Sequence, residues 1–312
     1  MERLSKEDEV DISIELAGLE LRTPLLLASG VAGLSISLMR KAVEAGAGAV
    51  VTKTVTYRPR KGFENPTLVK LGEHSYLNAM GLPNPGFMAV AKEFRGISLD
   101  APIIASVAPS NEEEAADMCS VMGEVFDAVE LNLSCPHVKS IGLDIGSDPD
   151  FVRSIVKAAK HSTDVPIFTK ISPNVTDIVS IGTSAVEAGT DCLVATNTLR
   201  AMAVDVEAAA PVLGNVIGGL SGQALHPVAL RIVYELYSKL RGRTGIVGSG
   251  GVRDWTGAIE FMLVGASAVQ IGSAIEEKGL EIFREICEGV RNYLRNKGYR
   301  KTSEIIGLAV RA

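Results

Sequence analysis

Short apolar runs alternate with amphipathic stretches along the whole chain, a pattern typical of parallel α/β architecture. Three junctions share one pattern, in which a helix end is followed by a glycine and a buried strand, and they lie at residues 42–51, 185–194 and 262–271. Eight apolar runs read as buried strands, at residues 24–28, 48–53, 102–107, 127–132, 166–171, 191–196, 244–249 and 267–271. Helical periodicity predicts helices at about 35–45, 85–95, 112–123, 149–161, 176–188, 225–240, 254–263 and 279–296.

Eight strand–helix units over about 250 residues predict a (β/α)8 TIM barrel. We expect one such domain over residues 1–312. Residues 11–22 predict a short N-terminal β-hairpin that turns at Ala17-Gly18 and could close the bottom of the barrel. A doubly wound open sheet is the alternative fold, and the lack of a GxGxxG after the first strand counts against it.

Long loops are expected after strands 2, 4 and 6, and long loops in a compact domain usually carry function or disorder. They are residues 54–84, the glycine-bearing segment after Cys135, and residues 197–224. The segment after Cys135 is a candidate lid.

Composition and charge narrow the function classes. The chain has 312 residues, is 46% hydrophobic and carries a net charge of −6, so no basic surface for nucleic acid or acidic lipid is expected. Its four cysteines form no CxxC pair, which predicts no metal site on this chain and fits a reducing cytoplasm. The charged N-terminus and the lack of a long apolar stretch predict neither a signal peptide nor a membrane anchor.

Two lysines, Lys53 and Lys170, each end an apolar strand. In a barrel, the active site lies where the strands end. A buried ammonium is costly unless an anion meets it, so the two lysines favour an anionic ligand pair such as a cofactor and a substrate. Two alternatives remain: the lysines reach solvent or pair with Glu130, or one of them forms a Schiff base.

The apolar run 127–132 ends at Asn132, and Cys135 follows three residues later, next to a proline. A buried cysteine is commonly an inert core residue, and Cys192, inside a strand, reads as one. Cys135 instead lies beyond a strand end, where its thiol could face a ligand. A free thiol has a pKa near 8.5 and is a usable but weak base.

Glycines follow the last two strands, at 248–251 (GSGG) and at Gly272-Ser273. In TIM barrels this is the usual position of a bound phosphate, which backbone N–H groups hold. The alternative is that these glycines only make tight turns.

Taken together, these residues resemble the dihydroorotate dehydrogenase family, class 1, and within it most closely the class 1B catalytic subunit. The resemblance runs in order across nearly the whole chain. It rests on segments 27–30 (LASG), 51–56 (VTKTVT), 77–86 (LNAMGLPNPG), 130–139 (ELNLSCPHVK), 170–175 (KISPNV), 196–198 (TNT), 219–222 (GLSG), 227–231 (PVALR), 248–252 (GSGGV) and 266–269 (ASAV).

The resemblance implies an FMN-dependent oxidation of dihydroorotate to orotate in pyrimidine biosynthesis. Cys135 would take a proton from C5 of the substrate as a hydride leaves C6, and Lys170 would stabilise negative charge at the N1/O2 edge of the flavin. The implied cofactor-binding residues are Ser29, Lys53, Thr54, Asn132, Lys170, Thr196, Gly222, Gly250, Gly251, Gly272 and Ser273. The implied substrate-binding residues are Lys53, Asn78, Ala79, Met80, Gly81, Leu82, Asn132, Asn197 and Thr198.

The chain departs from the class 1B pattern at Ser106, where relatives usually carry asparagine, so a flavin contact there is left open. Class 1B relatives pass electrons to an FAD/[2Fe–2S] partner subunit that serves NAD, whereas class 1A relatives use fumarate. The resemblance therefore implies a partner subunit and a homodimeric or heterotetrameric assembly. Three alternatives remain: an FMN-dependent dehydrogenase of another dihydropyrimidine, a Schiff-base aldolase or phosphosugar enzyme, and a non-catalytic flavin store.

Overall fold

A closed barrel of eight parallel strands forms the centre of the computed structural model, which describes residues 10–133 and 145–311. Each barrel strand lies within a range predicted from the apolar pattern, so the expected (β/α)8 fold is confirmed. The open-sheet alternative is wrong, because β10 pairs with both β9 and β15 and closes the ring. The barrel strands are β3 (Leu25–Leu27), β4 (Ala49–Val51), β7 (Ile103–Val107), β8 (Ala128–Asn132), β9 (Ile167–Ile171), β10 (Cys192–Ala195), β15 (Gly245–Ser249) and β16 (Ala268–Ile271).

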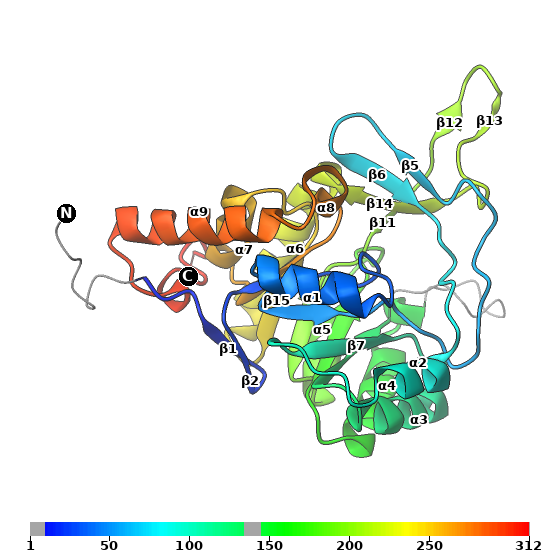
Figure 1. Cartoon of the computed structure of the whole chain (residues 1–312), viewed down its shortest axis with the longest axis horizontal. Coiled ribbons are helices and arrows are strands. Elements are labelled where there is room, and N and C mark those ends of the chain that lie inside the picture. Colours follow the sequence, from blue (N-terminus) through cyan, green and yellow to red (C-terminus); the bar gives the residue numbers. More distant parts are fainter. Residues whose placement is uncertain (1–9, 134–144, 312) are drawn as a thin grey trace.

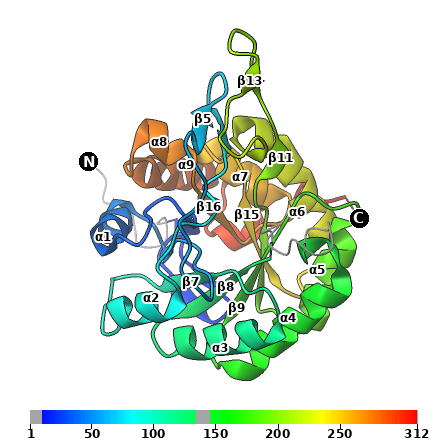
Figure 2. The same cartoon turned by 90° about the vertical axis from the view of Figure 1, so that its right-hand side faces the viewer.

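Helices surround the barrel as the amphipathic stretches predict (Figure 2). Asp148 and Asp254 cap two of them, since their carboxylates accept hydrogen bonds from the N–H groups of Asp150 and Gly257. The helices are α1 (Ile36–Ala45), α2 (Phe87–Phe94), α3 (Glu112–Gly123), α4 (Pro149–Ser162), α5 (Ile178–Glu187), α6 (His226–Leu240), α7 (Trp255–Leu263), α8 (Ala274–Lys278) and α9 (Ile282–Lys297). The sequence pattern did not predict α8, nor the short 3-10 turns η2 (Ile145–Ser147), η3 (Gln223–Leu225) and η4 (Thr302–Glu304).

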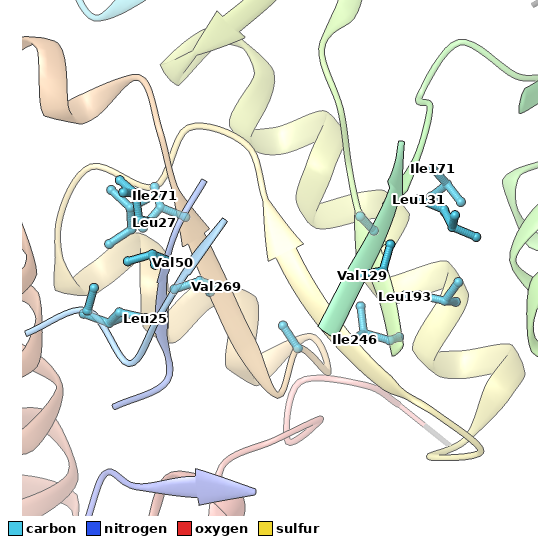
Figure 3. Close-up of a cluster of buried hydrophobic side chains, with 14 of the residues drawn as sticks. Leu25, Leu27, Val50, Val129, Leu131, Ile171, Leu193, Ile246, Val269 and Ile271 are labelled. Carbon is cyan, nitrogen blue, oxygen red and sulfur yellow. The ribbon is translucent and has the colours of Figure 1, made fainter. Parts of the chain in front are cut away.

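Alternate residues of each strand face opposite sides of the barrel wall. Leu25 and Leu27 belong to the cluster between strands and helices (Figure 3). Leu26 belongs to the smaller cluster inside the barrel. The same alternation puts Ala128 inside and Val129 outside. Polar residues two positions after an inward apolar residue therefore also face the barrel interior, nearer the carboxyl ends of the strands.

The predicted N-terminal hairpin is confirmed as β1 (Ile14–Leu16) and β2 (Leu19–Leu21), which pair antiparallel. Leu16 and Leu21 pack in the interior cluster of the barrel. Leu16 lies at the start of β15, because a Cβ built on Gly245 would lie 2.9 Å from its Cδ1. The hairpin therefore closes the amino end of the barrel and leaves the carboxyl end for ligands.

The long connections after β4 and β10 are more regular than the expected loops. They contribute four strands to one sheet of order β11-β14-β6-β5, and a small β12–β13 hairpin extends from it. In Figure 1 this sheet lies on the far side of the barrel strands from the β1–β2 hairpin. The added strands are β5 (Leu68–Lys70), β6 (Ser75–Asn78), β11 (Leu199–Ala201), β12 (Val204–Asp205), β13 (Ala210–Pro211) and β14 (Gly218–Gly222).

The third long loop, after β8, falls mostly on residues 134–144, so Cys135 and the candidate lid lie outside the described residues. Among the residues that are described, no helix has both the length and the apolar character needed to cross a bilayer.

Candidate active site

A cavity of about 920 Å³ lies where the barrel strands end and the four-stranded sheet begins. Both long connections supply its wall, because β6 ends at Asn78 and the β10–β11 connection carries Asn197 and Thr198. The structure thus brings together residues from widely separated parts of the chain. The predicted site residues in this wall are Ser29, Lys53, Thr54, Asn78, Ala79, Met80, Gly81, Leu82, Asn132, Lys170, Asn197 and Thr198.

The predicted phosphate residues Gly251 and Ser273 line a small neighbouring hollow. Gly251 has a φ of +68°, and a Cβ there would lie 2.5 Å from the carbonyl oxygen of Gly222. Any side chain at 251 would therefore strain the backbone and collide with it. A Cβ at Gly272 would lie 3.3 Å from Ala28, so both glycine turns pass close to neighbouring backbone or side chains.

Three other predicted residues, Thr196, Gly222 and Gly250, do not line this cavity, and the position of a fourth, Cys135, is not described. Thr196 is buried, and its hydroxyl donates a hydrogen bond of 3.2 Å to the carbonyl of Ile171. Cys135, the expected base, follows the described residue Leu133 by two positions and lies outside the described part of the chain.

A chain of hydroxyl groups runs from the cavity into the barrel. Ser29 Oγ lies 2.9 Å from Thr54 Oγ1, which lies 2.9 Å from the fully buried Ser106 Oγ. The Asn132 amide also donates to Thr54 Oγ1, at 3.1 Å, and accepts a hydrogen bond of 3.1 Å from Asn197. These contacts orient the Asn132 side chain from both ends. The Ser106 hydroxyl thus helps to orient the Thr54 hydroxyl from inside the barrel.

Lys170 is buried and lies at the base of the cavity. Its ammonium donates a hydrogen bond of 2.7 Å to Oε1 of Gln270, and the Gln270 amide donates one of 2.6 Å to Oε2 of Glu130. Lys170 Nζ and Glu130 Oε1 are 3.9 Å apart. The alternative in which Lys170 pairs with Glu130 is therefore correct, although a glutamine, absent from the predicted set, stands between them.

Lys53 presents a different environment at the same cavity. Burial lowers the pKa of its ammonium, since desolvation disfavours the charged form. Within residues 10–133 and 145–311, no side chain forms an ion pair with it. A cation of this kind favours an anionic ligand in the cavity.

The turn at residues 78–82 is shaped by its backbone. Gly81 and Leu82 both have positive φ, and a Cβ on Gly81 would lie 2.7 Å from the backbone nitrogen of Phe63. The Asn84 side chain donates a 2.8 Å hydrogen bond to the Leu82 carbonyl and accepts one of 3.2 Å from the Thr56 N–H. This part of the wall is therefore a defined turn that presents backbone groups to the cavity.

The prediction missed several wall residues, among them Arg60, Asn174 and Arg200. Asn174 donates a hydrogen bond of 3.1 Å to the Thr198 carbonyl and accepts one of 2.8 Å from the Arg200 N–H, so it fixes the start of β11. Its position four residues after Lys170, beyond the end of β9, was a usable signal. Arg60 and Arg200 lie in the long connections, where sequence alone does not indicate what a charge faces.

The described residues contain no cluster of three histidine, cysteine or acidic side chains that could hold a metal ion. Burial raises the pKa of Cys119 to about 12 and also raises the pKa of Cys192, so both remain protonated thiols in the core. The cavity therefore offers lysines, amides and hydroxyl groups, which suit a polar, anionic organic ligand.

The family model described as dihydroorotate dehydrogenase matches residues 11–294 of the chain. The chain is 47% identical over 300 residues to the "Dihydroorotate dehydrogenase B (NAD(+)), catalytic subunit" of Pyrococcus abyssi, covering 96% of this chain and 99% of that protein. Proteins with the same name from Pyrococcus furiosus and Methanosarcina acetivorans are 49% and 45% identical over 300 residues each. These matches cover 96% and 94% of this chain, and 99% and 94% of the relatives.

Proposed function

The chain belongs to the dihydroorotate dehydrogenase family, and from that premise we propose that it oxidises dihydroorotate to orotate in pyrimidine biosynthesis, with FMN as cofactor. The observation that carries the proposal is the common cavity at the carboxyl end of the barrel. Side chains from four separated parts of the sequence meet there, including Lys53, Asn132, Lys170 and Asn197. The one domain, residues 1–312, would hold cofactor and substrate together.

The residues present fit FMN. A cavity of about 920 Å³ is large enough for a flavin ring and a pyrimidine together. Lys170 offers a cation at its base. The turns at Gly251 and Gly272 approach neighbouring residues so closely that a side chain at either position would disturb them. When bound, FMN would supply the acceptor for the hydride. Its proposed contacts are Ser29, Lys53, Thr54, Asn132, Lys170, Thr196 and Gly222 around the ring and Gly250, Gly251, Gly272 and Ser273 around the phosphate.

The substrate is recognised by charge and by amide groups in this proposal. Lys53 binds the carboxylate of dihydroorotate. The negative charge of this carboxylate offsets the desolvation that lowers the pKa of the Lys53 ammonium. Asn132 and Asn197 hold the polar edge of the pyrimidine, joined to each other by their 3.1 Å hydrogen bond. The remaining proposed contacts are Asn78, Ala79, Met80, Gly81, Leu82 and Thr198.

Cys135 acts as the general base that removes the proton from C5 while the hydride leaves C6. This role comes from the family resemblance of segment 130–139, because the residue lies outside the described part of the chain. A thiol with an ordinary pKa near 8.5 needs a substrate held in position and shielded from water to act efficiently.

Electrons leave through a second protein in this proposal. The relatives are named as catalytic subunits of an NAD(+) enzyme, which supports a partner subunit for this chain. We infer that the partner carries FAD and a [2Fe–2S] cluster and that the two subunits form a heterotetramer around a homodimer in the cytoplasm.

The contacts of Lys170 argue against the Schiff-base alternative. A Schiff base forms from a neutral amine. The Lys170 nitrogen is instead engaged within the protein, because it donates a hydrogen bond to Gln270 and lies 3.9 Å from the buried Glu130 carboxylate. The pKa of Lys53 is lowered by burial, which would suit a Schiff base. However, no other residue in the segments that carry the family resemblance requires imine chemistry.

Ligand titration of the purified protein tests this function. The protein is expected to be yellow with one FMN per chain, and orotate is expected to perturb the flavin spectrum more strongly than uracil does. Stronger perturbation by uracil would refute the substrate, and colourless protein trapped by borohydride with a ketose would refute the reaction class.

A further inference from the structure

Glu130 and Lys170 are the only charged residues in the buried set of residues 10–133 and 145–311. We propose that Glu130, through Gln270, offsets the charge of Lys170 and positions it toward the cavity, an inference that rests on the proposed flavin chemistry. Neither Glu130 nor Gln270 lines the cavity, so neither would touch a ligand itself.

The strand pattern places the three side chains together. Glu130, Lys170 and Gln270 each lie two residues after an inward apolar residue of their strand, namely Ala128, Phe168 and Ala268. They therefore form a polar layer inside the barrel, immediately above the apolar interior cluster.

The hydrogen bonds define the direction of each group. Gln270 accepts from the ammonium and donates to the carboxylate, so its amide can satisfy both partners in only one orientation. Ser106 donates a hydrogen bond of 3.3 Å to the other carboxylate oxygen. The carboxylate is therefore held on both sides.

The glutamine has a specific consequence for Lys170. Gln270 stands between the Lys170 ammonium and the Glu130 carboxylate. With Gln270 between them, the carboxylate lies 3.9 Å away and still stabilises the charge, while only one of the three N–H donors is used by Gln270. Among the described residues no other side chain accepts a hydrogen bond from this ammonium, so its other donors can meet a ligand in the cavity, at the ring edge that would gain negative charge on reduction.

Few other titratable groups face Lys170 from the elements around it. Glu130 comes from β8, Lys53 follows β4 at the same cavity, and Cys192 comes from β10. Burial raises the pKa of Cys192, which keeps it neutral. In the described part of the barrel interior, Glu130 is thus the carboxylate that offsets Lys170.

The test is the pH dependence of the reduction potential of bound FMN, together with the rate of flavin reduction by dihydroorotate. Glu130→Gln removes the charge and keeps the size. In this variant the reduction rate is expected to fall about tenfold, and the potential is expected to acquire an extra pH dependence, because Lys170 then takes up a proton on reduction. FMN content stays unchanged, because the phosphate turns lie elsewhere.

The double variant E130Q/Q270E moves the carboxylate to position 270 within the same contacts. It is expected to remove the extra pH dependence, a rescue that a merely structural role for Glu130 would not produce. When Lys170 is already replaced by glutamine, adding E130Q is expected to cause no further change in the pH dependence of the reduction potential. The matched control is Glu124→Gln, which removes an exposed glutamate paired with Arg95 at 3.5 Å and should behave like wild type.

Gln270→Met tests separately whether Gln270 positions Lys170. It also provides the test if the E130Q variant does not fold. It keeps Glu130, so the reduction rate should fall while the pH dependence stays that of wild type. An unchanged rate in Q270M, or a wild-type pH dependence in folded, FMN-loaded E130Q, would overturn the inference. If wild-type enzyme is itself not reduced by dihydroorotate, the proposed function has failed instead.

Discussion

The Asn197 side-chain amide donates a hydrogen bond of 3.1 Å to Oδ1 of Asn132, joining the ends of two barrel strands that flank β9. Because the Asn132 amide also donates to Thr54, its donor and acceptor ends are both assigned by neighbours. The polar edge of the cavity is therefore organised by the protein itself.

Asn197→Ala should weaken the enzyme through this contact. The substitution removes one proposed substrate contact and releases Asn132, so kcat/KM for dihydroorotate should fall about tenfold or more, with little change in Tm. Steady-state kinetics and thermal unfolding measure both effects. Asn292→Ala, which removes an exposed amide bonded to Arg295, is the matched control and should leave kcat/KM unchanged. Equal kinetics in the two variants would argue against a role for Asn197.

Cys135→Ala should retain FMN and lose dihydroorotate oxidation by about a thousandfold. In the wild type, kcat/KM should rise with pH toward the thiol pKa, because the thiolate is the base. The core thiol of Cys119 has its pKa raised by burial to about 12, so it does not titrate in this range. Cys119→Ala is therefore the control, with its pH profile expected to match wild type. Loss of FMN from C135A would instead indicate a structural role.

Lys53→Met should weaken orotate binding by about a hundredfold while affecting uracil little, because only orotate carries a carboxylate. Burial lowers the pKa of Lys53, so in the free wild-type protein the ammonium is lost at a lower pH than an ordinary lysine would lose it. Orotate affinity should therefore fall as pH rises through that pKa, and K53M should lack this decline. Both affinities can be measured at several pH values by titrating each ligand against the flavin spectrum. If K53M kept the wild-type preference for orotate over uracil, Lys53 would not be the carboxylate-binding residue.

Glu277 should make the fold sensitive to acid. The hydrogen bonds from Lys70, at 2.7 Å, and from His74 lower the pKa of Glu277 from an ordinary 4.5 to about 2. A carboxylate with a lowered folded-state pKa adds stability above its unfolded pKa, and this stability is lost as the pH falls from about 4.5 to about 2.

Thermal unfolding of wild type and Glu277→Gln over this pH range measures that contribution. The two proteins should differ at pH 6 and converge toward pH 2, whereas Glu124→Gln should show a much smaller change, because its pair with Arg95 is exposed at the surface. A difference between wild type and E277Q that is independent of pH would show that the ion pair is not its source.

The barrel was predictable because its strands are buried on both faces and read as continuous apolar runs. Lys53, Asn132 and Lys170 were visible for a related reason, since each is a polar residue at or just past the end of such a run. Asn197 was visible in the same way, because it directly follows the apolar run 191–196, whereas the resemblance supplied Asn78, which periodicity alone would have left in a loop.

The sheet above the cavity could not be predicted in the same way. Its β14 strand has the sequence GGLSG, which lacks the branched and aromatic residues of a typical strand, and it pairs with β6, more than a hundred residues away. The place of Gln270 between Lys170 and Glu130 was hidden as well. It depends on three strands meeting across the barrel interior, which no local pattern reports.

Anaerobic mixing of the FMN-loaded wild-type protein with dihydroorotate tests the central claim most directly. The account predicts that the flavin absorbance bleaches within the turnover time, with one orotate formed per flavin reduced, and that Cys135→Ala stays oxidised under the same conditions. A flavin that remains oxidised in the wild type, or that bleaches equally fast in C135A, would contradict it.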